Sequence, residues 1–120
     1  MAISRDESDP IATVVDWLDA CRSRRIHALL DLYDDAATLE CACGGSKTLT
    51  GRAALEAYWR PRLADPLPGS FSMDDVTADA EGVILDYRCH DGTPVRMHFN
   101  FNDAGKILYT RCAPLVCCAA

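Results

Sequence analysis

The first part of the chain carries apolar residues at helical spacing. Asp9 followed by Pro10 is typical of a helix start, because the Asp side chain accepts hydrogen bonds from free backbone amides and Pro fits the first turn. Apolar residues then recur every three or four positions as far as Arg24, which predicts one helix. A second apolar stretch at residues 26–33 predicts a short helix that packs on the first and ends at Asp34.

Shorter segments with alternating polarity follow. Residues 37–43 predict a strand with Leu39 and Cys41 on one face, and residues 48–50 predict an edge strand. A third helix is expected from Gly51, and Pro61 should kink or shorten it. After a proline-rich loop, alternation predicts further strands at residues 71–79, 83–89, 94–101 and 106–112.

Helices followed by an antiparallel sheet form an α+β layout. Asp91-Gly92 indicates a two-residue hairpin turn, which would pair Arg88 with Val95 and Asp86 with Met97. This register predicts one face toward the helices, made of Ile84, Asp86, Arg88, Val95, Met97, Phe99, Phe101, Leu108, Thr110 and Cys112. The opposite face, too apolar for a solvated sheet, would be a homodimer interface made of Val83, Leu85, Tyr87, Cys89, Arg96, His98, Asn100, Ile107, Tyr109 and Arg111.

Composition narrows the classes of protein. The 120 residues predict a single domain, with residues 1–8 and 115–120 as flexible tails. A formal charge of −6 argues against nucleic acid or an anionic membrane as the main partner. No apolar run approaches the roughly 18 residues of a membrane span, and residues 1–10 lack a signal-peptide core, which predicts a cytoplasmic protein. In that compartment the seven cysteines are expected to be mostly thiols.

The stretch from Ile26 to Ala64, with its short helix, strand, Gly-rich turn and Thr-Gly-Arg-Ala-Ala-Leu-Glu-Ala-Tyr-Trp segment, resembles the nuclear transport factor 2-like superfamily. That superfamily includes ketosteroid isomerase and the SnoaL-like polyketide cyclases. The resemblance implies a cone-shaped α+β barrel of three N-terminal helices on a curved, mostly antiparallel sheet, and a sheet-to-sheet dimer. Ketosteroid isomerisation needs a carboxylate base and two proton donors around an oxygen. Trp17, Cys41 and Met97 stand at those positions here, so this reaction is not expected.

Asp86 is the candidate catalytic residue. The predicted pairing places its carboxylate among apolar side chains, where burial would raise its pKa and suit it to general acid or base work. Arg88, two positions along on the same face, would either orient an oxygen of the substrate or form an ion pair with Asp86. The pair is also similar to the epoxide hydrolases of the superfamily, although their second Asp is not recognisable here.

The first functional hypothesis is a protein that binds a small, mostly apolar molecule in the cone, with no cofactor and no metal. The expected ligand-binding side chains are Trp17, Cys41, Tyr58, Trp59, Met97, Phe99 and Thr110. The alternatives are an isomerase, cyclase or hydratase-type enzyme that uses Asp86, and a structural dimerisation module without a ligand.

The cysteines of the first strand allow two further interpretations. Cys41 and Cys43 share a strand face that Cys112 could approach, but the spacing lacks the close pairs of a zinc site, and small buried side chains are favoured. Cys41 as a nucleophile has no base near it in the sequence.

Overall fold

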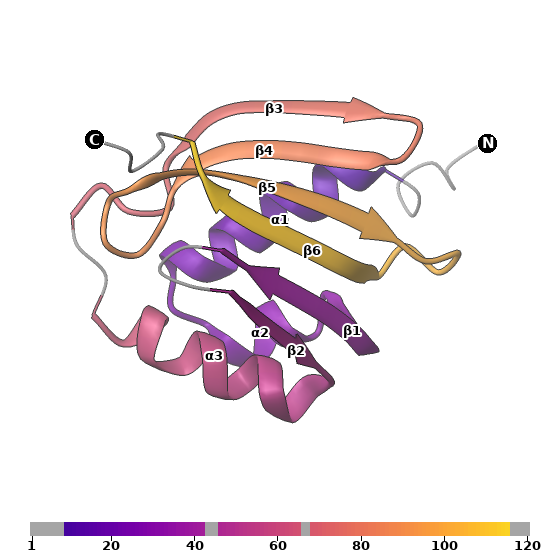
Figure 1. Ribbon diagram of the computed structural model, residues 1–120, viewed down its shortest axis with the longest axis horizontal. Helices are drawn as coiled ribbons and strands as arrows, with labels where there is room; N and C mark the ends of the chain where they lie inside the picture. The colour runs from indigo at the N-terminus through magenta and orange to yellow at the C-terminus, as the bar shows by residue number, and fades with distance from the viewer. Residues whose placement is uncertain (1–8, 43–45, 66–67, 116–120) are drawn as a thin grey trace.

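In the computed structural model, residues 9–42, 46–65 and 68–115 are described, and they form three helices and six strands (Figure 1). The elements in chain order are α1 (Pro10–Arg22), α2 (Ile26–Leu30), β1 (Tyr33–Cys41), β2 (Lys47–Thr50), α3 (Arg52–Ala64), β3 (Met73–Asp79), β4 (Gly82–Arg88), β5 (Pro94–Phe101) and β6 (Ile107–Pro114). The expected flexible tails, apart from Leu115, lie outside the described residues. None of the helices in the described ranges is long and apolar enough to cross a membrane.

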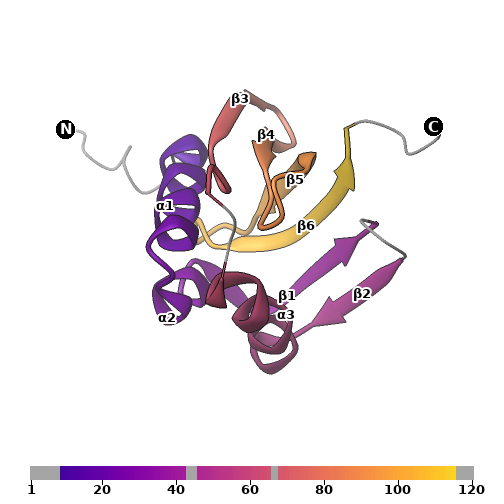
Figure 2. The same ribbon diagram turned by 90° about the vertical axis from the view of Figure 1, so that its left-hand side faces the viewer.

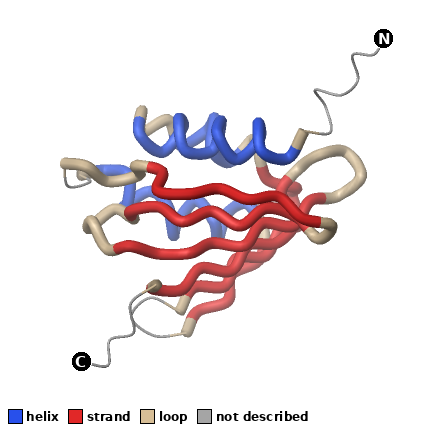
Figure 3. The backbone as a smooth tube through the Cα atoms, turned by 90° about the horizontal axis from the view of Figure 1, so that it is seen from above, coloured by secondary structure: helices blue, strands red, loops and turns tan. Residues whose placement is uncertain are grey.

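The strands form one sheet in the order β2-β1-β6-β5-β4-β3. Every neighbouring pair is antiparallel except β1 and β6, which run parallel. The sheet curls around the helices, with α1 against β3 and β4, α3 beside β1 and β2, and α2 between the two longer helices (Figures 2 and 3). This arrangement confirms the predicted α+β cone.

Local chemistry explains where the first two helices begin and end. Asp9 caps α1, because its Oδ1 accepts hydrogen bonds from the backbone of Ile11 at 3.1 Å and of Ala12 at 3.3 Å. The second helix is shorter than predicted, since Tyr33 begins β1 instead of completing α2. The cause lies far away in the sequence: Tyr33 pairs with Ile107 of β6, and this pairing draws the backbone into an extended conformation.

The hairpin between β4 and β5 differs from the prediction by one residue. The Cys89 amide donates to the Thr93 carbonyl at 3.0 Å, so the loop between them has three residues and not two. Gly92, the last loop residue, has a φ of 85°, the left-handed conformation that such loops require. Asp86 therefore pairs with Arg96, and the predicted partner Met97 is wrong.

A register shift of one residue exchanges the two faces of a strand. In β4 the buried side chains are Val83, Leu85 and Tyr87, and the predicted inward positions of Ile84, Asp86 and Arg88 are wrong. The inward positions of Val95, Met97, Phe99, Thr110 and Cys112 are confirmed. Ile107 and Leu108 exchange their predicted faces, because the pairing of β5 with β6 is irregular between Asn100 and Phe101.

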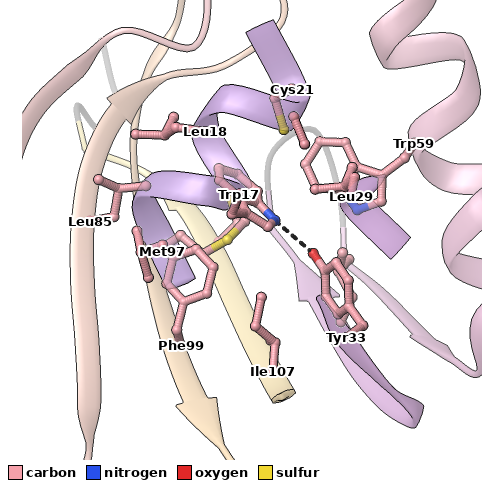
Figure 4. Packing of buried hydrophobic residues seen from close by; sticks show 14 of the residues in the cluster. Trp17, Leu18, Cys21, Leu29, Tyr33, Trp59, Leu85, Met97, Phe99 and Ile107 are labelled. Carbon is pink, nitrogen blue, oxygen red and sulfur yellow. Dashed lines mark hydrogen bonds between the residues drawn. The ribbon is translucent and has the colours of Figure 1, made fainter. Parts of the chain in front are cut away.

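Aromatic rings pack closely in the core beside α1 (Figure 4). The Trp17 ring packs edge-on against Trp59, Tyr87 and Phe99, with centroids 5.4, 5.3 and 5.3 Å away. Its indole N–H donates to the Tyr33 hydroxyl at 3.1 Å, and both side chains are buried. The interior around α1 is thus a packed core and not an open chamber.

Candidate functional site

A pocket of about 230 Å³ lies at the end of the cone where β1 and β6 finish and β4 turns into β5. Helix α3 forms one wall, and the segment before β3 contributes one ring. The lining residues are Cys41, Tyr58, Trp59, Arg62, Phe71, Tyr87, Cys89, His90, Asp91, Thr93, Cys112 and Pro114.

The floor of the pocket combines thiols with phenols. Cys41 and Cys112 are register neighbours on the parallel strands β1 and β6. The Tyr58 hydroxyl donates to Cys41 Sγ at 3.2 Å. Tyr87 stacks with Phe71 at a centroid distance of 6.2 Å and an interplanar angle of 15°. Burial raises the pKa of both Tyr58 and Tyr87, so both phenols remain protonated at neutral pH.

Helix α3 places a positive charge beside this floor. Tyr58 and Arg62 are four residues apart and therefore lie on the same side of the helix. The Arg62 guanidinium carbon is 3.7 Å from the centroid of the Tyr58 ring, and its Nη1 donates to the Tyr58 carbonyl at 2.9 Å. This geometry is a cation–π contact, which holds the guanidinium over the ring at the pocket wall.

The β4–β5 hairpin supplies the rim. The Cys89 thiol donates to Asp91 Oδ1 at 2.9 Å, and the Thr93 amide donates to the same oxygen at 3.0 Å. These two bonds lower the pKa of Asp91 to about 2, and burial raises the pKa of Cys89. At neutral pH the rim therefore carries a fixed carboxylate and a neutral thiol, and the Asp91 carboxylate is too weak a base to remove protons efficiently.

The structure brings together three of the seven expected ligand-binding residues, Cys41, Tyr58 and Trp59. The other four, Trp17, Met97, Phe99 and Thr110, are buried in the core and do not line this pocket, because the packed rings around α1 occupy that part of the cone.

Asp86 and Arg88 lie on the convex face of the sheet, away from the pocket. Arg96 donates to both oxygens of Asp86, from Nε at 2.7 Å and from Nη2 at 3.0 Å. These bonds hold the pKa of Asp86 below its usual range, so the expected upward shift is wrong. Arg88 donates to Asp74 at 3.3 Å, and the expected pair between Asp86 and Arg88 is not formed.

Sequence reasoning missed Arg62, Phe71, Tyr87 and the hairpin rim. A predicted loop of three residues, His90-Asp91-Gly92, would have placed Tyr87 on the inward face of β4 and so identified it as a pocket residue. Within residues 9–42, 46–65 and 68–115, no group of three His, Cys, Asp or Glu side chains is placed to hold a metal ion. Cys43, which entered the metal interpretation, lies outside the described residues.

Several solved protein structures share the fold of this chain. A SnoaL-like protein of unknown function from Burkholderia thailandensis has a TM-score of 0.77 at 22% identity, covering 89% of this chain and 95% of that one. The enzyme SalBIII, described as epoxide hydrolase/cyclase-like and linked to pyran ring formation in the polyether salinomycin, has a TM-score of 0.67 at 19% identity, covering 91% and 92%.

A protein from Mycobacterium tuberculosis, solved in complex with estradiol-17beta-hemisuccinate, has a TM-score of 0.62 at 12% identity, covering 86% and 91%. Identities this low establish the fold and leave the function open. No curated protein matches the sequence. The model of the SnoaL-like domain matches residues 14–109, and the chain therefore belongs to the SnoaL-like domain family.

Proposed function

We propose that this protein binds a small, mostly apolar molecule in the pocket between α3 and the β4–β5 hairpin. One observation carries the proposal: the walls combine the rings of Tyr58, Trp59, Phe71 and Tyr87, whereas the charged groups Arg62 and Asp91 come from α3 and the hairpin rim. Apolar walls with few polar groups are typical of small-molecule sites.

The size of the pocket limits the ligand to one or two rings. A buried cavity of about 150 Å³ holds benzene, and pockets for drug-sized molecules begin at about 300 Å³. The pocket here, at about 230 Å³, lies between these sizes. The steroid complex of the mycobacterial neighbour supports ligand binding within this fold. In this chain the rings of Trp17, Trp59 and Phe99 pack against one another in the core, which leaves this pocket too small to enclose a steroid.

Titration of the ¹⁵N-labelled protein with indole, 2-naphthol and oestradiol tests the proposal. We expect the two smaller compounds to shift the amide signals of the hairpin and the C-terminal half of α3, and oestradiol to bind more weakly. The variant Thr93→Phe places a ring in the pocket mouth and should weaken binding. Its matched control, Thr77→Phe, adds the same ring to the exposed edge strand β3. Equal binding in both variants would show that the ligand binds outside this pocket and would refute the proposal. No shifts at all would leave a structural module without a ligand.

An enzyme that uses Asp86 as general acid or base is not proposed further. The carboxylate lies on the opposite side of the sheet from the pocket and is held by two hydrogen bonds from Arg96. Reaching a ligand in the pocket would require β4 to slip by one residue, which would expose Val83, Leu85 and Tyr87.

We also propose a homodimer through the convex face of the sheet. Its observed surface is more polar than expected, with the Asp86–Arg96 pair and a hydrogen bond from Tyr109 to Glu40 at 2.7 Å. Tyr and Arg are nevertheless enriched at protein interfaces, and Leu108 adds an apolar side chain that is 41% exposed.

We keep the cytoplasm as the proposed location, since thiols such as Cys21 and Cys89 stay reduced there.

A further inference from the structure

Cys41 lies at the end of a short series of contacts that leads from the α3 wall to the floor of the pocket. Arg62 contacts the face of the Tyr58 ring at 3.7 Å, and the Tyr58 hydroxyl donates to Cys41 Sγ at 3.2 Å. In the sequence, Cys41 has no activating group nearby. Helix α3 supplies one in three dimensions, from residues that follow Cys41 by 17 positions and more.

Two features of the site favour negative charge on the Cys41 sulfur and oppose the effect of burial, which favours the neutral thiol. A hydroxyl that donates to sulfur stabilises the thiolate more than the thiol, and a guanidinium in the same pocket adds a favourable charge. Tyr58 stays protonated over the physiological range, because burial raises its pKa, and it therefore remains a donor. The thiolate is the form of cysteine that attacks electrophiles.

The other thiols of the pocket differ in this respect. Cys89 donates its own proton to Asp91, an arrangement that stabilises the neutral thiol and opposes its ionisation. Cys112 is the register neighbour of Cys41 and lines the same floor, but Tyr58 donates to Cys41. The hydrogen bond from Tyr58 thus singles out Cys41 as the candidate nucleophile of this pocket.

We propose that Cys41 is a nucleophile that captures, by conjugate addition, a small α,β-unsaturated carbonyl compound carrying an apolar ring. This inference rests on the proposed ligand pocket. The aromatic walls would hold the ring, the sulfur would lie beside the β-carbon, and Tyr58 or Arg62 would face the carbonyl oxygen. Only 5% of the Cys41 residue surface is exposed, so the electrophile must enter the pocket to react.

The reaction needs no other reactant. The sulfur forms a bond to the β-carbon, and the electrons of the carbon–carbon π bond move toward the carbonyl oxygen to give an enolate. The proton that the thiol loses returns at the α-carbon, which restores the carbonyl group. The product is a thioether, and no oxidant, reductant or leaving group is involved.

Benzylideneacetone and its saturated analogue benzylacetone form a matched pair of probes. The reduced, desalted protein is incubated with benzylideneacetone, and adduct formation is followed by intact mass. Peptide sequencing by mass spectrometry then separates Cys41 from Cys43, which share a tryptic peptide. Benzylacetone cannot react, and its binding is measured by amide chemical shifts.

We expect one adduct at Cys41, formed faster than the adduct of N-acetylcysteine, and we expect the hydrogen bond donated to the thiolate to contribute a factor of about ten to this rate. Cys41→Ala should abolish it, and Tyr58→Phe, which removes only the hydroxyl, should slow it by about the same factor. The control Cys21→Ala replaces a buried thiol of α1 outside the pocket and should react like the wild type.

The outcomes separate the two proposals. If benzylacetone binds but the adduct is absent, forms at another cysteine, or forms equally fast in Tyr58→Phe, the activation of Cys41 is refuted and the binding pocket stands. If benzylacetone does not bind and no adduct forms, both proposals fail.

Discussion

The buried hydrogen bond between Trp17 and Tyr33 allows a direct test of how the core is held together. Tyr33→Phe removes one oxygen atom and leaves the indole N–H of Trp17 without its acceptor. Both residues are almost completely buried, so water cannot replace the missing partner. A buried donor left unsatisfied costs about 1–3 kcal/mol.

For a domain of this size, that loss lowers the melting temperature by about 4 °C per kcal/mol, or about 4–12 °C in total. Urea unfolding followed by tryptophan fluorescence measures the change in the free energy of unfolding. The matched control is Tyr109→Phe, which removes a hydroxyl that donates to Glu40 on the convex face. Because water reaches that site, we expect a cost below about 1 kcal/mol. Equal losses in the two variants would refute the reasoning.

Tyr33 should also make the free energy of unfolding depend on pH. Burial raises the pKa of Tyr33 in the folded protein, with the Trp17 hydrogen bond acting in the opposite direction, whereas the unfolded phenol titrates near 10. The stabilisation is therefore complete below about pH 10 and is lost as the pH rises further, because only the unfolded chain then releases the proton. Tyr33→Phe should weaken this alkaline loss of stability, and an unchanged pH profile would contradict the assignment.

Three further predictions concern the surface and the rim. Asp86→Asn should cost at most about 1 kcal/mol in urea unfolding, since the Arg96 partner is half exposed, and should leave probe binding unchanged; weaker binding would restore Asp86 to the site. The pKa of Asp91, lowered to about 2, predicts stability that is lost as the pH falls from about 4 to 2; acid unfolding of Asp91→Asn should lack this step. Leu108→Glu should convert the proposed dimer to monomer in light scattering, whereas a wild-type monomer would exclude the dimer.

The sequence predicts the elements well where the hydrophobic pattern is unambiguous. In β5, apolar and polar residues alternate strictly from Val95 to Phe99, so the inward face is the same for any loop length. In β4, Val83, Ile84 and Leu85 are all apolar, so the pattern allows either the register that buries Val83 and Leu85 or the one that buries Ile84. The length of the hairpin loop sets the register. The Asp91-Gly92 sequence fits both a two-residue and a three-residue loop, so it does not determine that length.

Tyr33 illustrates a second limit, set by contacts distant in the sequence. Its spacing from Leu29 and Leu30 suits a helix, and local propensity favours neither state clearly. The pairing with Ile107 places it in β1, where it can accept the Trp17 hydrogen bond. A parallel pairing over such a separation leaves no mark in the local pattern, so neither the start of β1 at Tyr33 nor the buried hydrogen bond could be predicted.

The same interaction explains why the pocket lies at the mouth of the cone. The resemblance to ketosteroid isomerase implies a tyrosine on the first helix, where this chain has Trp17. The larger indole fills the deep interior against Trp59 and Phe99, and its only donor is satisfied by Tyr33. No polar group of Trp17 is then left for a ligand, and the space that remains is bounded by Tyr58, Cys41 and the hairpin. In this chain the SnoaL-like fold therefore combines a packed aromatic core with a separate pocket, for which we propose the chemistry of the Cys41 thiol.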